Sequence, residues 1–234
     1  MMITEAIILA GGLGTRLRDT VPGLPKSMAP VAGQPFLKYV IAYYRKQGIE
    51  KFIFSLGYKH KVIEDFLLKE CSDLDYSSVI EEEPLGTGGA IYKAVNEVTS
   101  SNVLVLNGDT FFQIDLERLS AFHVSNKSDC TLCLKEMNNT DRYGIVEISA
   151  DARIQSFKEK RFYETALING GVYALNADNF LKEKFPQKFS FENDYFEKLY
   201  RERRMFGIVQ DGYFIDIGIP EDYKKAQQDF KSFA

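Results

Sequence analysis

Short apolar runs alternate with helical patterns through the first half of the chain, and this alternation limits the fold more than any other feature. Buried strands are expected at residues 5–10, 52–56, 76–80 and 103–106. Helices are expected at residues 35–47, 61–69 and 90–97, the last one after a turn at 83–89. This β-α-β-α order predicts a mainly parallel sheet with helices on both faces. Since such sheets bind ligands at the carboxyl ends of their strands, the loops after residues 10, 80 and 106 should meet at one crevice.

The second half is richer in strands. They are expected at residues 130–137, 144–148, 154–158, 167–175, 206–210 and 213–217. Helices are expected at 191–203, whose apolar side chains suit core packing better than a subunit contact, and from residue 221 onward. No repeat or linker divides the 234 residues, so we predict one α/β domain over residues 1–234 with a mixed, mainly parallel central sheet.

Composition narrows the class of protein. Charged residues make up 26% of the chain and the net charge is −4, which argues against a nucleic-acid-binding surface. The apolar stretches are far shorter than the roughly 20 residues of a membrane span, and the run at 6–10 is too short for a signal peptide. Three sparse cysteines suit a reducing compartment, so we expect a cytoplasmic protein. Cys130 and Cys133, three apart on an expected strand, should face opposite sides and pack rather than bind zinc.

A glycine-rich loop follows the first expected strand, at residues 9–17 (LAGGLGTRL). Its glycines let the backbone approach a ligand closely, so that amides point at phosphate oxygens, and Arg16 and Lys26 add positive charge. The dinucleotide-binding pattern fails because Leu17 replaces its last glycine, which argues against a dehydrogenase. The P-loop pattern fails at Arg16. On these residues alone, a turn that merely joins strand to helix remains an alternative.

The loop resembles the signature of the sugar-phosphate nucleotidyltransferases, G-G-x-G-T-R-L followed by P-K, and the resemblance covers nearly the whole chain. One departure is Ser27, where many members have proline or alanine. The resemblance implies a three-layer, Rossmann-like nucleotidyltransferase fold with a small strand-rich part for the sugar. Residues 1–110 would mainly bind the nucleotide and residues 111–234 mainly the sugar phosphate. The implied reaction joins a nucleoside triphosphate to a sugar 1-phosphate with Mg²⁺ and releases pyrophosphate.

The resemblance also implies roles for single residues. Gly11 and Gly12 would contact the nucleotide through their backbones, Arg16 would bind the leaving phosphates, and Lys26 would bind the α-phosphate. Arg16, Lys26 and Asp109 form the expected catalytic set. Further nucleotide contacts are expected from Leu9, Gly14, Thr15, Glu81, Gly86, Thr87, Gly88 and Gly108. Because the attacking sugar phosphate oxygen is already anionic, the reaction needs positioning and charge neutralisation rather than a general base.

The segment 81–89 (EEEPLGTGG) resembles the turn with which the family receives the base. Glu82 and Glu83 also suit an ordinary solvated turn. Glu81 is more informative, because relatives that use thymidine or uridine nucleotides often carry glutamine there. A carboxylate only accepts hydrogen bonds, and guanine presents two adjacent donors, N1–H and N2–H₂. Glu81 therefore favours GTP as the nucleotide.

Two aspartates are expected to bind Mg²⁺. Asp109 follows the buried strand of 103–109 (VLVLNGD), and Asp216 opens 216–220 (DIGIP). Either aspartate alone would suit a turn or a helix cap. The family's G-D and D-x-G-x-P motifs match here and imply that both ligate Mg²⁺, which needs only one or two protein carboxylates beside water and substrate phosphates.

Three short segments resemble the family's sugar-phosphate site. Tyr143-Gly144 matches its Y-G, and Glu159-Lys160 matches its E-K, although Arg161 replaces the usual proline. Asn169-Gly170-Gly171 matches its N-x-G, with Asn169 on the sugar and Gly170 as a further expected contact. The structural alternatives are a solvated charged turn for Glu159 and Lys160 and a β-bulge for the glycines.

Three longer segments narrow the resemblance to D-glycero-α-D-manno-heptose 1-phosphate guanylyltransferases, which make GDP-heptose for bacterial surface polysaccharides. They are residues 141–144 (DRYG), 167–173 (LINGGVY) and 213–223 (YFIDIGIPEDY). Alternatives are a mannose 1-phosphate guanylyltransferase, a hexose 1-phosphate uridylyl- or thymidylyltransferase, and a non-catalytic nucleotide-sugar sensor. The expected partners are small-molecule substrates, without nucleic acid or membrane, and the sequence leaves a homodimer open.

Overall fold

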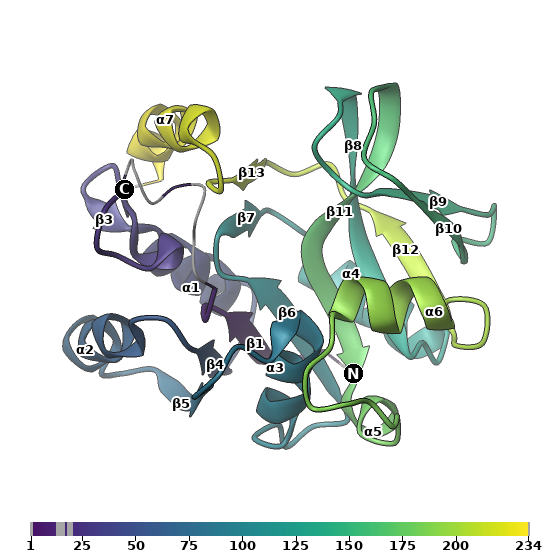
Figure 1. The fold of residues 1–234 in the computed structure, drawn as a ribbon, viewed down its shortest axis with the longest axis horizontal. Helices are drawn as coiled ribbons and strands as arrows, with labels where there is room; N and C mark the ends of the chain where they lie inside the picture. The colour runs from purple at the N-terminus through teal and green to yellow at the C-terminus, as the bar shows by residue number, and fades with distance from the viewer. Residues whose placement is uncertain (1, 13–16, 18–20, 234) are drawn as a thin grey trace.

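The computed structural model describes residues 2–12, 17 and 21–233 (Figure 1). Within that part of the chain, nine strands form one mixed sheet in the order β10-β9-β11-β6-β1-β4-β5, and β8 joins β11 and β12 beside it. The first half of the chain contributes β1 Glu5–Leu9, β4 Lys51–Leu56, β5 Asp75–Ile80 and β6 Asn102–Asn107, which are parallel to one another. The second half contributes β8 Cys130–Thr140, β9 Ile145–Ile148, β10 Ile154–Lys158, β11 Tyr163–Asn176 and β12 Met205–Val209.

Alternate residues of the central strands bury opposite faces of the sheet. Ile8 packs into one core with Phe54 and Leu106, whereas Ile7 packs into a second core with Ile53 and Val105. The first core is covered by α1 Phe36–Lys46, α2 His60–Glu70, α4 Leu116–Ser125 and α7 Pro220–Asp229. The second is covered by α3 Gly86–Val95, α5 Ala177–Phe180 and the π-helical segment η3 Phe191–Phe196. The predicted three-layer α/β fold with a mixed, mainly parallel sheet is therefore confirmed.

Cys130 and Cys133 lie on β8 and belong to different cores, so they face opposite sides of the sheet as expected. Both are fully buried, and burial raises the pKa of both thiols. They pack as small apolar side chains.

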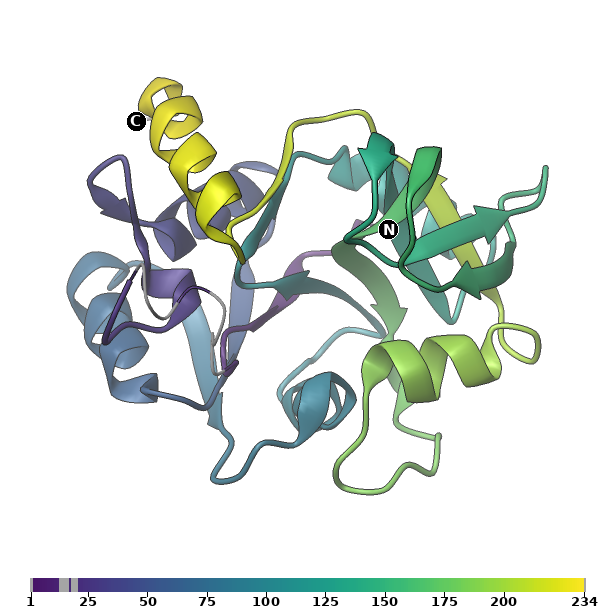
Figure 2. The same ribbon diagram turned by 45° about the horizontal axis from the view of Figure 1, so that its top comes forward.

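The C-terminal segment packs against the first half of the chain. A small sheet pairs β13 Phe214–Asp216 with β7 Thr110–Phe112, and α7 then packs on the hairpin of β2 Pro30–Val31 and β3 Gln34–Pro35 (Figure 2). The Tyr223 hydroxyl donates to the carbonyl oxygen of Pro30 at 2.6 Å. Short elements complete the described chain: η2 Lys26–Met28, α6 Glu197–Leu199 and η4 Phe230–Ser232.

Most expected elements lie within one or two residues of their predicted bounds, and four predictions, for two strands and two helices, were wrong in extent. The strand expected at 130–137 runs on to Thr140, and the strand expected at 167–175 begins at Tyr163. The helix expected at 90–97 begins at Gly86, inside the predicted turn. The helix expected at 191–203 starts as a π-helix and ends at Leu199. Several elements were not predicted, namely β2, β3, β7, α4 and α5. Among the described residues, no helix has the length and apolar character that crossing a bilayer requires.

Candidate active site

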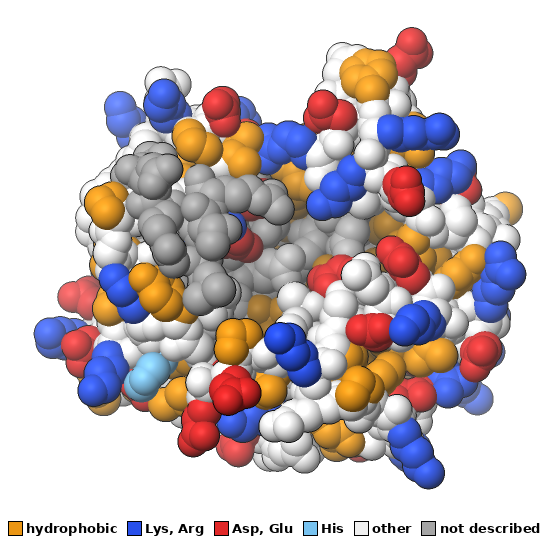
Figure 3. Space-filling model, in the orientation of Figure 1, with side chains coloured by type: hydrophobic (Ala, Val, Ile, Leu, Met, Phe, Trp, Pro, Cys, Tyr) orange, Lys and Arg blue, Asp and Glu red, His pale blue; other side chains and the backbone are white. Residues whose placement is uncertain are grey.

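The carboxyl ends of the parallel strands open into a large cavity of about 2040 Å³. Gly11 and Gly12 after β1, Glu81 after β5 and Gly108 after β6 line it, so the three loops meet as predicted. Figure 3 shows this face of the molecule hollowed at its centre. Cavities for one small ligand are about 300–1,000 Å³. The volume therefore leaves room for two substrates side by side.

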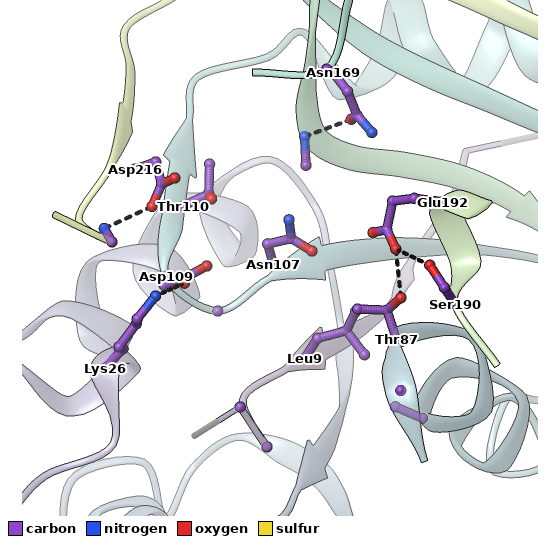
Figure 4. Close-up of a pocket in the computed structure, with 18 of the residues that line it drawn as sticks. Leu9, Lys26, Thr87, Asn107, Asp109, Thr110, Asn169, Ser190, Glu192 and Asp216 are labelled. Carbon is purple, nitrogen blue, oxygen red and sulfur yellow. Dashed lines mark hydrogen bonds and ion pairs between the residues drawn. The ribbon is translucent and has the colours of Figure 1, made fainter. Parts of the chain in front are cut away.

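The two aspartates are brought together by the small sheet. Asp216 is the partner of Thr110 in the pairing of β13 with β7, and the Ile217 amide donates to the Asp109 carbonyl oxygen at 3.0 Å. Lys26 lies beside them, with its Nζ 3.2 Å from Asp109 Oδ2 (Figure 4). Burial, and then the neighbouring Asp109, raise the pKa of Asp216 against the opposing hydrogen bond from the Gly218 amide. Lys26 and Arg142 are the positive neighbours that oppose this rise, and the two close carboxylates offer the hard oxygen ligands that Mg²⁺ prefers.

The turn that resembles the family's base site is fixed by backbone contacts with the segment before η3. Gly86 has a φ of +73°, and its missing Cβ would lie 2.5 Å from the Phe189 carbonyl oxygen. The Gly88 amide donates to that same oxygen at 3.0 Å. Gly88 is buried and does not line the cavity, unlike Gly86 and Thr87. Its predicted nucleotide contact is therefore not supported by its position.

Glu81 lies between the end of β5 and this turn. Its Oε2 accepts a hydrogen bond from the Leu85 amide at 3.0 Å, and its Oε1 accepts one from the Ser55 hydroxyl at 3.3 Å. The carboxylate is thus held at the cavity wall, and each oxygen keeps a further lone pair for a ligand.

Five of the six expected sugar-phosphate residues line the same cavity: Tyr143, Gly144, Glu159, Lys160 and Asn169. Gly170 does not, because it faces the ring of Phe112, 2.5 Å from where its Cβ would be. Gly171 lines the cavity instead. The pairing of β11 with β8 shifts register between Asn169 and Tyr173, so the glycines form the irregularity that was the structural alternative.

Side-chain contacts hold this wall in place. Asn169 Nδ2 donates to the Tyr173 hydroxyl at 3.0 Å, and Asn169 Oδ1 accepts from the Gly171 amide at 3.0 Å. Tyr143 packs its ring edge-on against Phe214, and burial raises the pKa of its hydroxyl to about 12. The Tyr143 hydroxyl therefore stays protonated at neutral pH and can donate a hydrogen bond.

Three predicted residues, Gly14, Thr15 and Arg16, lie outside the described residues. The other predicted nucleotide-binding residues line the cavity, namely Leu9, Gly11, Gly12, Lys26 and Gly108. The structure adds lining residues that the sequence analysis gave no role: Asn107, Thr110, Arg142, Tyr173, Ser190 and Glu192. Arg142 stood within a recognised motif, and its Nη2 bonds Asp222 Oδ2 of α7 at 2.9 Å.

The charges around the cavity are unbalanced among the described residues. Seven carboxylates line it: Glu81, Glu82, Asp109, Glu159, Glu192, Glu197 and Asp216. Four Lys or Arg side chains line it: Lys26, Arg142, Lys158 and Lys160. Arg16, the residue expected to bind the leaving phosphates, lies outside the described residues and is not part of this count.

Comparison with known proteins identifies the family to which the chain belongs. The family model for nucleotidyl transferases matches residues 5–232, so the chain belongs to the nucleotidyl transferase family. The family inferred from the glycine-rich loop is confirmed.

Individual relatives narrow the comparison to named enzymes. A D-glycero-α-D-manno-heptose 1-phosphate guanylyltransferase of Aneurinibacillus thermoaerophilus is 48% identical over 229 residues, covering 98% of this chain and 99% of that protein. The enzyme of the same name from Campylobacter jejuni is 44% identical, covering 94% of this chain and 96% of that protein. A crystal structure of HddC from Yersinia pseudotuberculosis complexed with GMP-PN matches with a TM-score of 0.87 at 37% identity, covering 97% of this chain and 100% of that chain.

Proposed function

We propose that this nucleotidyltransferase joins the GMP part of GTP to D-glycero-α-D-manno-heptose 1-phosphate, with Mg²⁺, and forms GDP-heptose and pyrophosphate. The observation that carries the proposal is the likeness over nearly the full chain to two guanylyltransferases named for that sugar phosphate. The two-substrate cavity at the carboxyl ends of β1, β5 and β6 supports it. Since GTP is an intracellular substrate, we place the reaction in the cytoplasm.

The residues in the cavity suit a direct displacement. An oxygen of the sugar phosphate forms a bond to the α-phosphorus of GTP, while the bond from that phosphorus to the pyrophosphate oxygen breaks. Lys26 would hold the α-phosphate, because its ammonium group lies at the carboxyl end of β6 beside Asp109. Lys160, which also lines the cavity, would hold the sugar phosphate. The anionic nucleophile needs no proton acceptor, so the contribution of the chain is alignment and charge.

Asp109 and Asp216 fit a magnesium ion. They supply the hard oxygen ligands that Mg²⁺ prefers, and the raised pKa of Asp216 reflects burial and a like charge that a cation would offset. The ion would neutralise phosphate charge during transfer.

Glu81 supports guanine as the base. Its carboxylate faces the cavity beside Gly86, at the turn that resembles the family's base site. Guanine can donate N1–H and N2–H₂ to one carboxylate, whereas adenine and cytosine present an acceptor there.

The test is pyrophosphate release with Mg²⁺, with each of five nucleotides (ATP, CTP, GTP, UTP and dTTP) against heptose, mannose, glucose and N-acetylglucosamine 1-phosphates. Release with GTP and the heptose phosphate alone is expected. Release with mannose phosphate or a pyrimidine nucleotide would confirm nucleotidyl transfer but contradict the proposed substrates, GTP and the heptose phosphate. A folded protein that binds nucleotide and releases no pyrophosphate in any combination would be a sensor rather than an enzyme.

A further inference from the structure

Two of the three segments that narrowed the resemblance touch each other in the fold. Residues 141–144 form the loop between β8 and β9, and residues 213–223 run through β13 into the first turn of α7. Arg142 Nη2 donates to Asp222 Oδ2 at 2.9 Å, 80 positions further along the chain. The proposed reaction gives neither Arg142 nor Asp222 a role, so the reason for this contact has to be sought in the geometry of the cavity.

The loop of residues 141–144 docks on both sides of a proposed metal ligand. The Tyr143 ring packs edge-on against Phe214 with centroids 5.7 Å apart, and Arg142 pairs with Asp222. Asp216 lies between these two contact points in the sequence, and it lines the cavity together with Arg142. Burial would lower the pKa of the Arg142 guanidinium, but the hydrogen bond to Asp222 and nearby charges, Asp216 among them, outweigh it and raise that pKa.

Asp222 belongs to an element that is itself held in place. It lies in the first turn of α7, where the helix dipole favours a negative side chain. The Tyr223 hydroxyl and Gln227 Nε2 both donate to the carbonyl oxygen of Pro30, each at 2.6 Å, and so fix α7 on the β2–β3 hairpin. Arg142 therefore joins the loop between β8 and β9 to a helix that the first half of the chain positions.

The exposure of the pair indicates positioning rather than stability. The side chains of Arg142 and Asp222 are 38% and 24% exposed, and ion pairs near the surface contribute little to the free energy of unfolding. The pair nevertheless selects one placement of the loop that carries Tyr143 and Gly144. Such a placement matters, because a displacement of about 1 Å between reacting groups can lower a rate about 100-fold.

We propose that Arg142 is a positioning residue, whose ion pair with Asp222 aligns the loop of residues 141–144 with the segment that carries Asp216. The sugar 1-phosphate is then held in line with the nucleotide by a loop that is docked before either substrate binds. This inference rests on the proposed function, because it assigns the contact that aligns the same sugar-phosphate site.

The first test is a double-mutant cycle in the whole chain. Arg142→Gln and Asp222→Asn each remove one charge, and each should lower kcat/KM for the sugar 1-phosphate about tenfold while the KM for GTP changes less than about twofold. The double variant should be no worse than either single variant, because both changes break the same contact. The melting temperatures should fall by less than about 4 °C. If Arg142→Gln lowers kcat/KM by a further tenfold in the Asp222→Asn background, Arg142 contacts the substrate itself and the inference is overturned.

A conservative variant and a matched control separate the ion pair from the charge of α7. Asp222→Glu keeps a carboxylate within reach of Arg142 and should stay within about threefold of wild type, and a loss equal to that of Asp222→Asn would contradict the role of the pair. Lys225→Gln also removes a charge from α7 and breaks an ion pair, with Asp229 at 3.2 Å, but Lys225 does not line the cavity. This control should keep the kinetics of wild type. A tenfold loss there would assign the effect to α7 as a whole.

The same measurements keep this inference distinct from the proposed function. An active wild type whose Arg142→Gln and Asp222→Asn variants keep its kcat/KM for the sugar 1-phosphate would overturn the positioning role and leave the proposed function intact. A wild type that releases no pyrophosphate with any sugar 1-phosphate would reject the proposed function, and this inference with it. If Arg142→Gln does not fold, Asp222→Asn and Asp222→Glu carry the comparison.

Discussion

Glu5 is a buried carboxylate at the start of the central strand, and four donors surround it. The amides and hydroxyls of Thr99 and Ser100 all donate to its oxygens, and the Ser100 hydroxyl lies 2.6 Å from Oε2. Burial alone would raise the pKa of Glu5, but these hydrogen bonds outweigh it, so the pKa lies below its ordinary value of 4.5. The loop before β6 is thereby tied to β1.

We expect Glu5→Gln to lower the free energy of unfolding by about 1–3 kcal/mol at pH 7, because the amide opposes donors with donors of its own. A carboxyl group with a lowered folded pKa stabilises the protein above its unfolded pKa, and this contribution is lost as pH falls through the folded pKa. The difference between wild type and variant should therefore shrink below about pH 4.5. Urea unfolding at pH 7 and pH 4 measures both effects. Glu97→Gln, an exposed acid nearby, is the control, and an equal loss there would contradict the assignment.

Glu81 carries the prediction on base selectivity. With Glu81→Gln, the carbonyl still accepts a hydrogen bond and the amide now donates one, which matches a pyrimidine edge better than guanine. We expect the ratio of kcat/KM for GTP over UTP to fall at least about tenfold, the effect of one mismatched hydrogen bond in a binding site. An unchanged ratio would remove Glu81 from base recognition. The variant's melting temperature separates this effect from the loss of its bonds to Leu85 and Ser55.

Some residues of the site could be predicted from the sequence and others could not. Lys26 and Asp109 were predictable because each sits in a local motif whose neighbours fix its role. Glu192 was not, because its partner Thr87 lies 105 positions away and no local pattern connects them. Gly170 and Gly171 show a third case. The motif indicated the right segment, but only the bulge in β11 decides which glycine faces the cavity.

At the start of α3, tertiary packing outweighs the low helix propensity of glycine. Glycine is a poor helix former, so the pattern predicted a turn through residue 89. The helix begins at Gly86 because the segment before η3 packs directly on its first turn. The missing Cβ of Gly88 would lie 2.2 Å from the Phe189 ring. A sequence pattern cannot show that a distant segment needs this space.

Gly86→Ala tests this packing. Its Cβ would meet the Phe189 carbonyl oxygen at 2.5 Å, in addition to the strain of a φ of +73°. We expect a loss of about 3 kcal/mol in unfolding free energy, since overpacking adds to the cost of the left-handed conformation. Gly33→Ala is the matched control, because Gly33 has a φ of +84° and open space around its Cβ position. It should lose only about 1 kcal/mol. Equal losses in chemical denaturation would mean that conformation alone, and not the contact, matters at Gly86.

The small sheet of β7 and β13 was the hardest element to predict from the sequence. It is also the element that brings Asp109 and Asp216 together. β7 spans Thr110–Phe112, too short for a periodic pattern to predict. β13 was predicted as a strand, but nothing in its sequence names its partner. Their pairing sets Asp216 opposite Thr110 and thus beside Asp109. The motifs predicted both aspartates, whereas the structure supplies the reason that they meet.

For the whole molecule, the site cannot be assigned to one half of the chain. Antiparallel pairing of β11 with β6 makes one sheet of both halves, and α7 returns to contact β2 (Figure 1). Lys26 and Asp109 come from the first half, whereas Asp216 and Asn169 come from the second. The fold class was predictable because the strand and helix periods are local, but the return of the C-terminal segment depends on contacts such as that of Tyr223 with Pro30.

The aspartate pair should therefore lower the stability of the protein without ligands. Asp216 is partly buried and faces the like charge of Asp109, as the direction of its pKa shift indicates. Replacing Asp216 by Asn removes that charge and keeps an oxygen for the Gly218 amide, which now donates to Asp216 Oδ1 at 2.7 Å. Without divalent cations, Asp216→Asn should unfold about 2–4 °C above wild type, the shift that about 1 kcal/mol gives in a domain of this size.

The same variant should lose pyrophosphate release and the rise in melting temperature that Mg²⁺ with GTP gives wild type, because a ligand stabilises only the state that binds it. Asp109→Asn is the matched control. Asp109 forms an ion pair with Lys26 at 3.2 Å, so its neutralisation removes an attraction together with the repulsion and should not raise the melting temperature. Both variants should be inactive, but only Asp216→Asn should be more stable than wild type. If calorimetry without metal finds Asp216→Asn less stable than wild type, the buried like charge is not a source of strain, and the case for a cation bound between the two aspartates loses its electrostatic basis.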